Sequence, residues 1–492
     1  MAHELFPDFI PNMIGGAFTP ADAEGGIDVV NPHDASLLAR IPNSDAGTVA
    51  AAVEAARAAQ PGWAATPAVE RGEILHRIAN AMEAHLEDIA RIVALEAGKR
   101  MPDARGEARA AVQCARFFAG EGQRLFGRTM TSGTAGRWAM TVRQPCGVAG
   151  LIIAANTPAP NFAWKVFPAL ICGNAVVLKS AEDTPISSWF LGRLAAGVGV
   201  GGLPKGILNI VHGLGATAGW ALVEHPGVDV LSFTGSTRVG RLIAEAAGRQ
   251  LKKLSLELGG KNPLVVCDDA DLDNAVRWAC LAAFSNAGQR CAAGSRVIVF
   301  GAVFDAFMEK FVAATRALKL GVGDECDLGP VINARQLEAM TAAVERAAAD
   351  GARILCGGKR AAEPALAKGF YMPPTILVGL EPDAEISATE LFGPVVNVYR
   401  VDTFAEAVVL ANRSPYGLTA SIHTRDVDRA LAFAASVQSG VAVINGGTHG
   451  SEPHMPFGGV KASGNGSREP GTEALDVYSE LKDVYVNTRP PR

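Results

Sequence analysis

Charged residues are scarce in this chain, because Asp, Glu, Lys and Arg make up only 19% of its 492 residues. Globular proteins usually carry about a quarter, so we expect sister subunits to cover part of the surface. Basic residues are not in excess either, since 45 Lys and Arg against 50 Asp and Glu give a net charge of −5. Nucleic acids and anionic membranes bind basic surfaces, so neither is expected as a partner.

A long hydrophobic run is also missing. The most apolar stretch, Val148 to Ala155, covers eight residues, whereas a membrane-spanning helix needs about 20. The first residues include acids and prolines and lack the basic and then apolar pattern of a secretory signal. The sequence therefore predicts a cytoplasmic protein.

The eight cysteines form no CxxC pair and have no zinc-ligand spacing. In a long cytosolic chain such cysteines are expected to be reduced thiols rather than a disulfide framework. No metal site is predicted.

Hydrophobic residues make up 49% of the sequence, which excludes intrinsic disorder as the main state. At about 150 residues per domain, the length predicts roughly three domain-sized units. Helical spacing of apolar residues is found in three N-terminal segments, 45–60, 68–97 and 103–123.

Short apolar segments alternate with helical ones from Val148 onward, which is typical of parallel sheets covered on both faces. The first such run contains the expected strands 148–155, 174–179, 206–213 and 230–235. The second begins near Lys253 and contains the expected strands 254–260, 262–268, 295–300, 352–358, 395–400, 421–424 and 441–445. Segments 127–145 and 477–487 are rich in Thr, Val and Tyr and read as exposed strands of a subunit-pairing arm.

Cys291 is a candidate nucleophile. It lies in NAGQRCAAG (286–294), where small neighbours leave it accessible and Arg290 is expected to favour the thiolate. The alternative is a buried structural thiol, as most cysteines are.

Glu257 is a candidate general base. It ends an apolar strand in LELGGKNP (256–263), and apolar surroundings raise the pKa of a carboxyl group towards neutrality. The alternative is a solvated acid at the end of a strand. Asn156 follows another apolar strand in a turn with Pro158 and Pro160, where its amide could bind an oxyanion or simply form the turn.

Three consecutive strand ends carry groups suited to a dinucleotide. Lys179 and Glu182 could hold a ribose, and FTGSTRVG (233–240) places Ser236 and backbone N–H groups where they could hold a phosphate. GLGATA (213–218) matches a glycine-rich fingerprint, but no acid closes the next strand.

Together these segments resemble the aldehyde dehydrogenase superfamily along nearly the whole chain. The order and spacing of its motifs match, and the cysteine of GQRC follows the glutamate of LELGGKNP by 34 residues. The other matching motifs are AWK (163–165), VVLKxxExTP (176–185), FTGSTxVG (233–240), ELFGPV (390–395) and PFGGVKASG (456–464).

The resemblance implies an α/β subunit with a Rossmann-like cofactor domain, an α/β catalytic domain and a small β oligomerisation arm, assembled as a homodimer or homotetramer. The cofactor domain is expected at 1–126 with 146–258, and the catalytic domain at 259–460. The arm is expected at 127–145 with 465–488. Its implied catalytic residues are Cys291 as nucleophile, Glu257 as base and Asn156 as oxyanion donor.

The resemblance also implies an NAD site, with NADP as the other cofactor of the family. Its expected residues are Lys179 and Glu182 at the adenosine ribose, Ala216 near the adenine, Thr234, Gly235 and Ser236 at the pyrophosphate, and Glu390 and Phe392 at the nicotinamide. A carboxylate near the ribose 2′ oxygen repels a phosphate by ~1–4 kcal/mol at about 4 Å, so Glu182 favours NAD.

The implied reaction is oxidation of an aldehyde to a carboxylic acid, through a thioacyl group on Cys291 that is hydrolysed by water activated at Glu257. The expected pocket wall comprises Thr157, Asn161, Trp164, Arg290, Ala292, His449, Ser451 and Phe457. Its polar members favour a polar or aromatic aldehyde or a semialdehyde. Two alternatives stay open: a CoA-acylating semialdehyde dehydrogenase, and a catalytically silent NAD-binding protein of the same fold.

Overall fold

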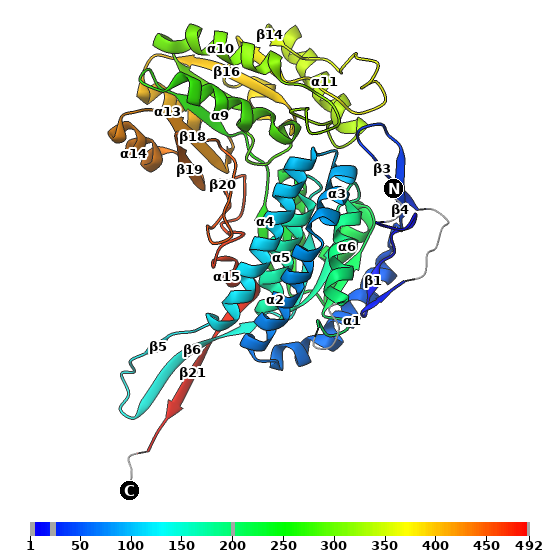
Figure 1. Cartoon of the computed structure of the whole chain (residues 1–492). Helices are drawn as coiled ribbons and strands as arrows, with labels where there is room; N and C mark the ends of the chain where they lie inside the picture. The colour runs from blue at the N-terminus through cyan, green and yellow to red at the C-terminus, as the bar shows by residue number, and fades with distance from the viewer. Residues whose placement is uncertain (1–4, 20–25, 198–201, 490–492) are drawn as a thin grey trace.

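The computed structural model describes residues 5–19, 26–197 and 202–489. Two α/β bodies lie one above the other, and a strand arm extends from the lower one (Figure 1). Within the described ranges, every helix is too short or too polar to cross a membrane. The same part of the chain contains no cluster of His, Cys, Asp and Glu that could hold a metal ion.

The lower body is built on a seven-stranded sheet in the order β11-β10-β7-β8-β9-β1-β2. The first five strands of this order are parallel, and β1 and β2 add an antiparallel edge. The bounds are β1 Met13–Ile14, β2 Ala17–Phe18, β7 Val148–Ile152, β8 Ala175–Lys179, β9 Leu208–Val211, β10 Val230–Thr234 and β11 Lys253–Glu257. The sequence predicts the five parallel strands but not the two edge strands.

The order of strands in this sheet reverses between β7 and β10. Helices α5 (Pro158–Ile171) and α6 (Pro185–Ala196) connect β7, β8 and β9, whereas α7 (Trp220–Glu224) and α8 (Thr237–Arg249) follow β9 and β10. Right-handed crossovers then place the two pairs of helices on opposite faces. In such sheets ligands bind beyond the carboxyl ends of the strands at this reversal.

Helices from the N-terminal region complete this body. The segment predicted as one helical stretch at 68–97 forms α2 (Ala68–Ala84) and α3 (Leu86–Ala97), because His85 leaves the helical conformation with φ −108° and ψ 25°. Helix α4 (Met101–Gly120) packs against α2, α3 and α5, and α1 (Ala46–Ala65) packs against the sheet. A hairpin of β3 (Ile27–Val30) and β4 (Leu37–Ile41) lies beside them.

The upper body has a second seven-stranded sheet in the order β14-β15-β16-β13-β12-β18-β19, parallel except for β14. Its strands are β12 Pro263–Val266, β13 Arg296–Phe300, β14 Arg353–Cys356, β15 Thr375–Val378, β16 Val395–Val401, β18 Thr419–His423 and β19 Val441–Ile444. Its longer helices are α9 Leu272–Phe284, α10 Phe304–Ala317, α11 Ala334–Ala349, α13 Phe404–Asn412 and α14 Val427–Ser436. The sequence misses β15, which is only four residues long.

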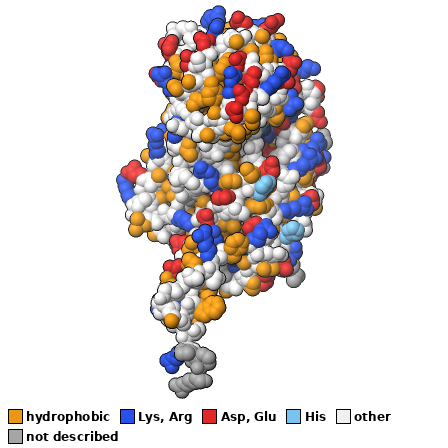
Figure 2. Space-filling model, turned by 90° about the vertical axis from the view of Figure 1, so that its left-hand side faces the viewer, with side chains coloured by type: hydrophobic (Ala, Val, Ile, Leu, Met, Phe, Trp, Pro, Cys, Tyr) orange, Lys and Arg blue, Asp and Glu red, His pale blue; other side chains and the backbone are white. Residues whose placement is uncertain are grey.

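The arm is a three-stranded antiparallel sheet in the order β21-β6-β5, made of β21 (Ser479–Asn487), β6 (Arg137–Pro145) and β5 (Thr129–Met130). Apolar side chains are exposed on it, as the patch near the bottom of Figure 2 shows. Residues 465–478, which the sequence analysis assigns to the arm, lie elsewhere: helix α15 (Ala474–Tyr478) is buried in the core of the lower body.

Candidate active site

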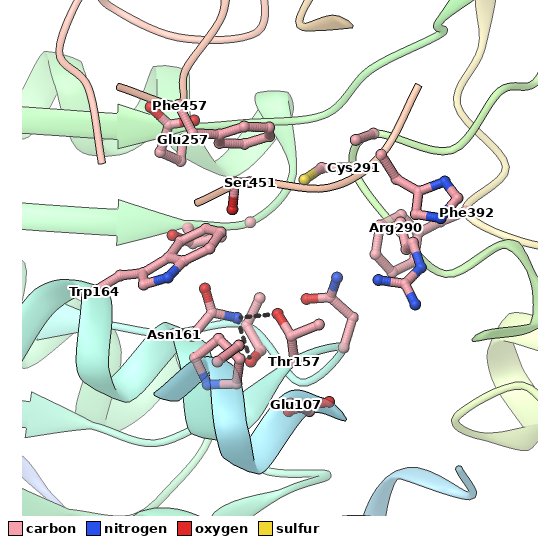
Figure 3. Close-up of a pocket in the computed structure, with 18 of the residues that line it drawn as sticks. Glu107, Thr157, Asn161, Trp164, Glu257, Arg290, Cys291, Phe392, Ser451 and Phe457 are labelled. Atoms are coloured by element: carbon pink, nitrogen blue, oxygen red, sulfur yellow. Dashed lines mark hydrogen bonds between the residues drawn. The ribbon is translucent and has the colours of Figure 1, made fainter. Parts of the chain in front are cut away.

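A cavity of about 660 Å³ is lined by residues of both bodies and of helix α4. It lies at the carboxyl ends of β7, β10 and β11, next to the loop that carries Cys291 (Figure 3). The cavity contains the three residues predicted as catalytic, which are Cys291, Glu257 and Asn156. It also contains all eight residues predicted for the pocket wall, which are Thr157, Asn161, Trp164, Arg290, Ala292, His449, Ser451 and Phe457. Five of the residues predicted for the cofactor line it as well, namely Thr234, Gly235, Ser236, Glu390 and Phe392. Lys179, Glu182 and Ala216 are not part of its lining.

The loop around Cys291 is fixed by hydrogen bonds to its carbonyl oxygens. Asn262 donates from Nδ2 to the carbonyls of Cys291 and Ala293, both at 2.8 Å. Thr448 donates from its hydroxyl to the carbonyl of Ala292 at 2.7 Å. A Cβ at Gly260 would lie 2.4 Å from the carbonyl oxygen of Cys291, so this close approach requires glycine.

The surroundings of Cys291 oppose ionisation of its thiol. Burial raises its pKa to about 12, and the charges of Glu390 and Glu257 act in the same direction. The N–H of Ala292 and the charge of Arg290 lower the pKa, with Arg290 the weakest of the five influences. The expectation that Arg290 favours the thiolate is therefore correct in sign, but burial and two carboxyl groups outweigh it.

Glu257 ends β11 and is 5% exposed, and neither of its carboxyl oxygens has a hydrogen-bond partner in the described part of the chain. Burial raises its pKa well above the ordinary value, and the charge of Glu469 raises it further, whereas Lys165 and Arg468 lower it. The raised pKa agrees with the expectation from its apolar neighbours. In its ionised form, a carboxylate in a cavity with no hydrogen-bond partner is free to accept a proton from water.

Behind Glu257 lies a buried ion pair that the sequence analysis misses. Lys165 donates from Nζ to Glu469 at 2.6 Å and to the hydroxyl of Ser232 at 2.5 Å. Both charged side chains are completely buried. Lys165 belongs to the AWK motif, but its partner is more than three hundred positions away, so spacing alone does not reveal the pair.

Asn156 lies just beyond β7 and is partly exposed to the cavity. Its Nδ2 donates to the carbonyl of Gln289 at 3.1 Å. Because an amide nitrogen carries two hydrogens, one donor remains for a group inside the cavity.

The cofactor candidates follow the carboxyl ends of neighbouring strands. Lys179 ends β8 and donates to Glu182 at 2.8 Å. Burial raises the pKa of Glu182, but the charge and hydrogen bond of Lys179 outweigh it, so that the pKa lies below the usual value. Ser236 caps the N-terminus of α8 by accepting from the N–H of Val239, and Ala216 is exposed beyond β9.

Glu390, another cofactor candidate, contacts the two glycines that follow β11. Its carboxyl group accepts from the N–H of Gly260 at 3.0 Å, and a Cβ at Gly259 would lie 2.0 Å from it. The two glycines of LELGGKNP thus leave room for the Glu390 carboxyl and for the Cys291 carbonyl. Burial raises the pKa of Glu390 to about 7.

Helix α4 supplies a wall of the cavity that the sequence analysis does not identify. Lys99, just before α4, and Glu107 within it form a buried ion pair that lines the cavity. The sequence predicts a helix over 103–123, but its apolar spacing does not show which polar side chains face a site.

Comparison with known proteins places the chain in a family. A model of the "Aldehyde dehydrogenase family" matches residues 18–484. The alpha-ketoglutaric semialdehyde dehydrogenase of Bacillus subtilis is 36% identical over 96% of this chain and 97% of its own. The NADP(+) succinate-semialdehyde dehydrogenase GabD of Escherichia coli is 38% identical over 96% of this chain and 97% of its own.

The fold of the chain also matches that of solved structures. The crystal structure of betaine aldehyde dehydrogenase from Staphylococcus aureus in complex with NAD+ has a TM-score of 0.95 and 31% identity, covering 98% of this chain and 95% of that one. The predicted α/β architecture and family are confirmed. The chain belongs to the aldehyde dehydrogenase family and is an NAD(P)-dependent aldehyde dehydrogenase.

Proposed function

We propose that the chain oxidises an aldehyde to a carboxylic acid with Cys291 as the nucleophile, Glu257 as the base and Asn156 as the oxyanion donor. One observation carries this assignment: a single cavity contains a thiol, an unbound carboxyl group and an amide donor. Nucleophile, base and electrophilic donor are the groups that acyl chemistry requires.

In the first step the thiol of Cys291 loses its proton to water and the sulfur adds to the aldehyde carbon. Negative charge develops on the aldehyde oxygen, and the free amide hydrogen of Asn156 stabilises it. The hydrogen bonds from Asn262 and Thr448 keep the nucleophile loop in place while the sulfur bonds to carbon.

The strand ends fit a dinucleotide, because they place a Lys–Glu pair, a helix N-terminus and a buried carboxyl group in a row. When bound, NAD(P) supplies the acceptor for the hydride that leaves the substrate carbon. Lys179 and Glu182 would bind the adenosine ribose, and Ala216 would lie near the adenine. Thr234, Gly235 and Ser236 would hold the pyrophosphate, and Glu390 and Phe392 would bind the nicotinamide ribose and ring. Glu182 repels a 2′-phosphate, so NAD is preferred over NADP.

Glu257 completes the reaction by hydrolysis. Its raised pKa makes it a stronger base than an ordinary carboxylate, suited to deprotonating water for attack on the Cys291 thioester. A base at this position favours water over coenzyme A as the acyl acceptor. The substrate class is a polar or aromatic aldehyde or a semialdehyde, as the polar side chains of the pocket and the names of the relatives suggest.

The arm supports assembly into a homodimer or homotetramer. It presents large apolar side chains to solvent, with Trp138 at 60%, Leu481 at 63% and Tyr485 at 59% exposure. Strands β5, β6 and β21 form the arm, and the cofactor and catalytic domains keep the boundaries assigned from the sequence. All eight cysteines are free thiols, which favours a cytoplasmic location.

An aldehyde panel tests this function. The purified chain is incubated with NAD+ and aliphatic, aromatic or carboxylated aldehydes, NADH is followed by absorbance, and the product is identified by mass spectrometry. We expect a carboxylic acid without coenzyme A. A thioester formed only with coenzyme A would establish the acylating alternative, and no NADH with any aldehyde would establish the silent one.

A further inference from the structure

We propose that Arg290 and His449 bind a carboxylate group of the substrate, so that the aldehyde oxidised at Cys291 is an aldehyde acid. This inference rests on the proposed function and narrows its substrate class. Both side chains line the cavity that contains the thiol.

Arg290 brings an uncompensated positive charge into the cavity. Its Nε is buried and has no hydrogen-bond partner, whereas the side chain as a whole is only half-buried. No salt bridge in the described ranges includes its guanidinium, since the acids of this region pair with other cations. A guanidinium that is partly withdrawn from water and has no anionic partner loses solvation. It is stabilised when an anion with two oxygens accepts its parallel N–H donors.

The acids that line the cavity near Arg290 are already paired. Glu107 is bound by Lys99, and Asp103 is held by Arg100 through two hydrogen bonds of 2.8 and 3.0 Å. The positive charge of Arg290 also acts on Lys99, which shows that the two cations are near each other. The electrostatic balance of this end of the cavity is therefore positive and suits an anion.

The other carboxyl groups of the cavity do not supply the missing anion. Glu390 is bound to the N–H of Gly260, and Glu257 lies at the aromatic side, where the rings of Trp164 and Phe457 are 5.8 Å apart. Burial raises the pKa of both glutamates, Glu390 to about 7 and Glu257 well above its ordinary value, which reduces their negative charge near neutral pH.

His449 is a second polar side chain in the wall of the cavity. Its Nδ1 is buried without a hydrogen-bond partner, and its ring packs edge-on against Trp278 at 6.5 Å between centroids. Burial lowers its pKa to about 4, and the charge of Arg290 adds to this, against an opposing influence of Asp103. His449 itself is half-buried and lines the cavity, and a neutral imidazole carries one N–H that donates to a carboxylate when the hydrogen is on the nitrogen facing the cavity.

One substrate molecule can contact both Cys291 and Arg290 in this cavity. Figure 3 shows the guanidinium of Arg290 extending from beside Cys291 to the side where Thr157 and Glu107 lie, opposite Trp164 and Phe457. An aldehyde carbon on the sulfur and a carboxylate on Arg290 can therefore belong to one substrate, because both residues line the same cavity. A neutral aldehyde leaves the guanidinium unpaired and is selected against.

The test compares matched substrates. Straight-chain aldehyde acids of four, five and six carbons are first assayed to find the one that is oxidised fastest. The value of kcat/KM is then measured for this acid and for its uncharged ω-amide. The ratio of acid to amide cancels any effect of Arg290 on the thiol, because both substrates react with the same Cys291.

The wild-type enzyme is expected to prefer the acid, and Arg290→Gln to lower the ratio at least about 20-fold, mainly through KM of the acid, since a charged hydrogen bond is lost. Arg290→Lys retains part of the preference, and His449→Phe lowers it about threefold or more. Arg346→Gln, which removes an exposed arginine paired with Glu385, is the control and leaves the ratio unchanged.

Two results would overturn the inference while leaving the proposed function intact: a wild-type preference for the amides, or an acid-to-amide ratio that Arg290→Gln does not change. Binding of glutarate, which has no aldehyde, is measured by calorimetry on the same proteins. Weaker binding to Arg290→Gln than to wild type supports the site even if no aldehyde is turned over, and equal binding contradicts it.

Discussion

Glu390 carries the charge that most strongly raises the pKa of the Cys291 thiol, after burial of the sulfur itself. The same carboxyl group is fixed by the N–H of Gly260 and has a pKa of about 7. When pH rises through this value the carboxyl group ionises, and its charge then opposes ionisation of the thiol. The reactivity of Cys291 is therefore coupled to the protonation of Glu390.

Replacing Glu390 should make Cys291 more reactive in the enzyme without cofactor. Glu390→Gln removes the charge, lowers the pKa of the thiol and increases its thiolate fraction at pH 8, so we expect alkylation by iodoacetamide to accelerate at least about threefold. The rate is followed by mass spectrometry on the peptide containing Cys291. Glu245→Gln, an exposed carboxylate on α8, should leave the rate unchanged; equal rates for both variants would contradict the coupling.

Cofactor preference should shift when the charge of Glu182 is removed. Its carboxylate is kept ionised by Lys179, and the repulsion of a 2′-phosphate is lost in Glu182→Gln. We expect the ratio of kcat/KM for NADP over NAD to rise about tenfold. Glu87→Gln, which breaks an exposed pair with Arg105, is the control. An unchanged ratio in the Glu182 variant would remove this residue from the ribose site.

The buried pair behind the base should be important for stability. Glu469→Ala leaves Lys165 charged, buried and without its carboxylate partner, and we expect a loss of about 3–5 kcal/mol. Asp273→Ala breaks the exposed pair with Lys310 and should cost less than about 1 kcal/mol. Urea unfolding followed by fluorescence measures both. Similar midpoints for the two variants would show that the buried pair is not important for stability.

Assembly should depend on the apolar surface of the arm. Leu481→Glu, at 63% exposure on β21, places a charge in the proposed subunit contact, and we expect a smaller particle by light scattering after size exclusion. Leu431→Glu, at 60% exposure on α14, is a matched change outside the arm and should leave the mass unchanged. An unaltered mass for the arm variant would contradict its role in assembly.

The spacing of apolar residues predicts the regular strands and helices of this molecule well. The five parallel strands of the lower sheet are short apolar runs between helices, and each is found where the pattern places it. The edge strands β1 and β2 are two residues each and carry no such pattern. The sequence assigns 465–478 to the arm, but the buried side chains of helix α15 pack into the lower core.

The site was predictable where a residue and its chemistry lie in one motif, as for Cys291 and Glu257. Features that depend on distant partners were not. The Lys165–Glu469 and Lys99–Glu107 pairs form through tertiary packing, and the desolvation of Cys291 with its two carboxyl neighbours outweighs the effect expected from Arg290 alone. Burial and long-range pairing are set by the fold, and the spacing of residues in the chain does not encode them directly.

The most direct test of the account is rapid-mixing measurement of NADH in Glu257→Gln, with Cys291→Ala and Glu245→Gln beside it. We expect a first burst of at most one NADH per active site in Glu257→Gln, then a steady rate lower by about a hundredfold or more, because the thioester on Cys291 is no longer hydrolysed. Cys291→Ala should give no NADH, and Glu245→Gln should behave as wild type. Unimpaired steady-state turnover in Glu257→Gln or in Cys291→Ala would contradict the proposed mechanism.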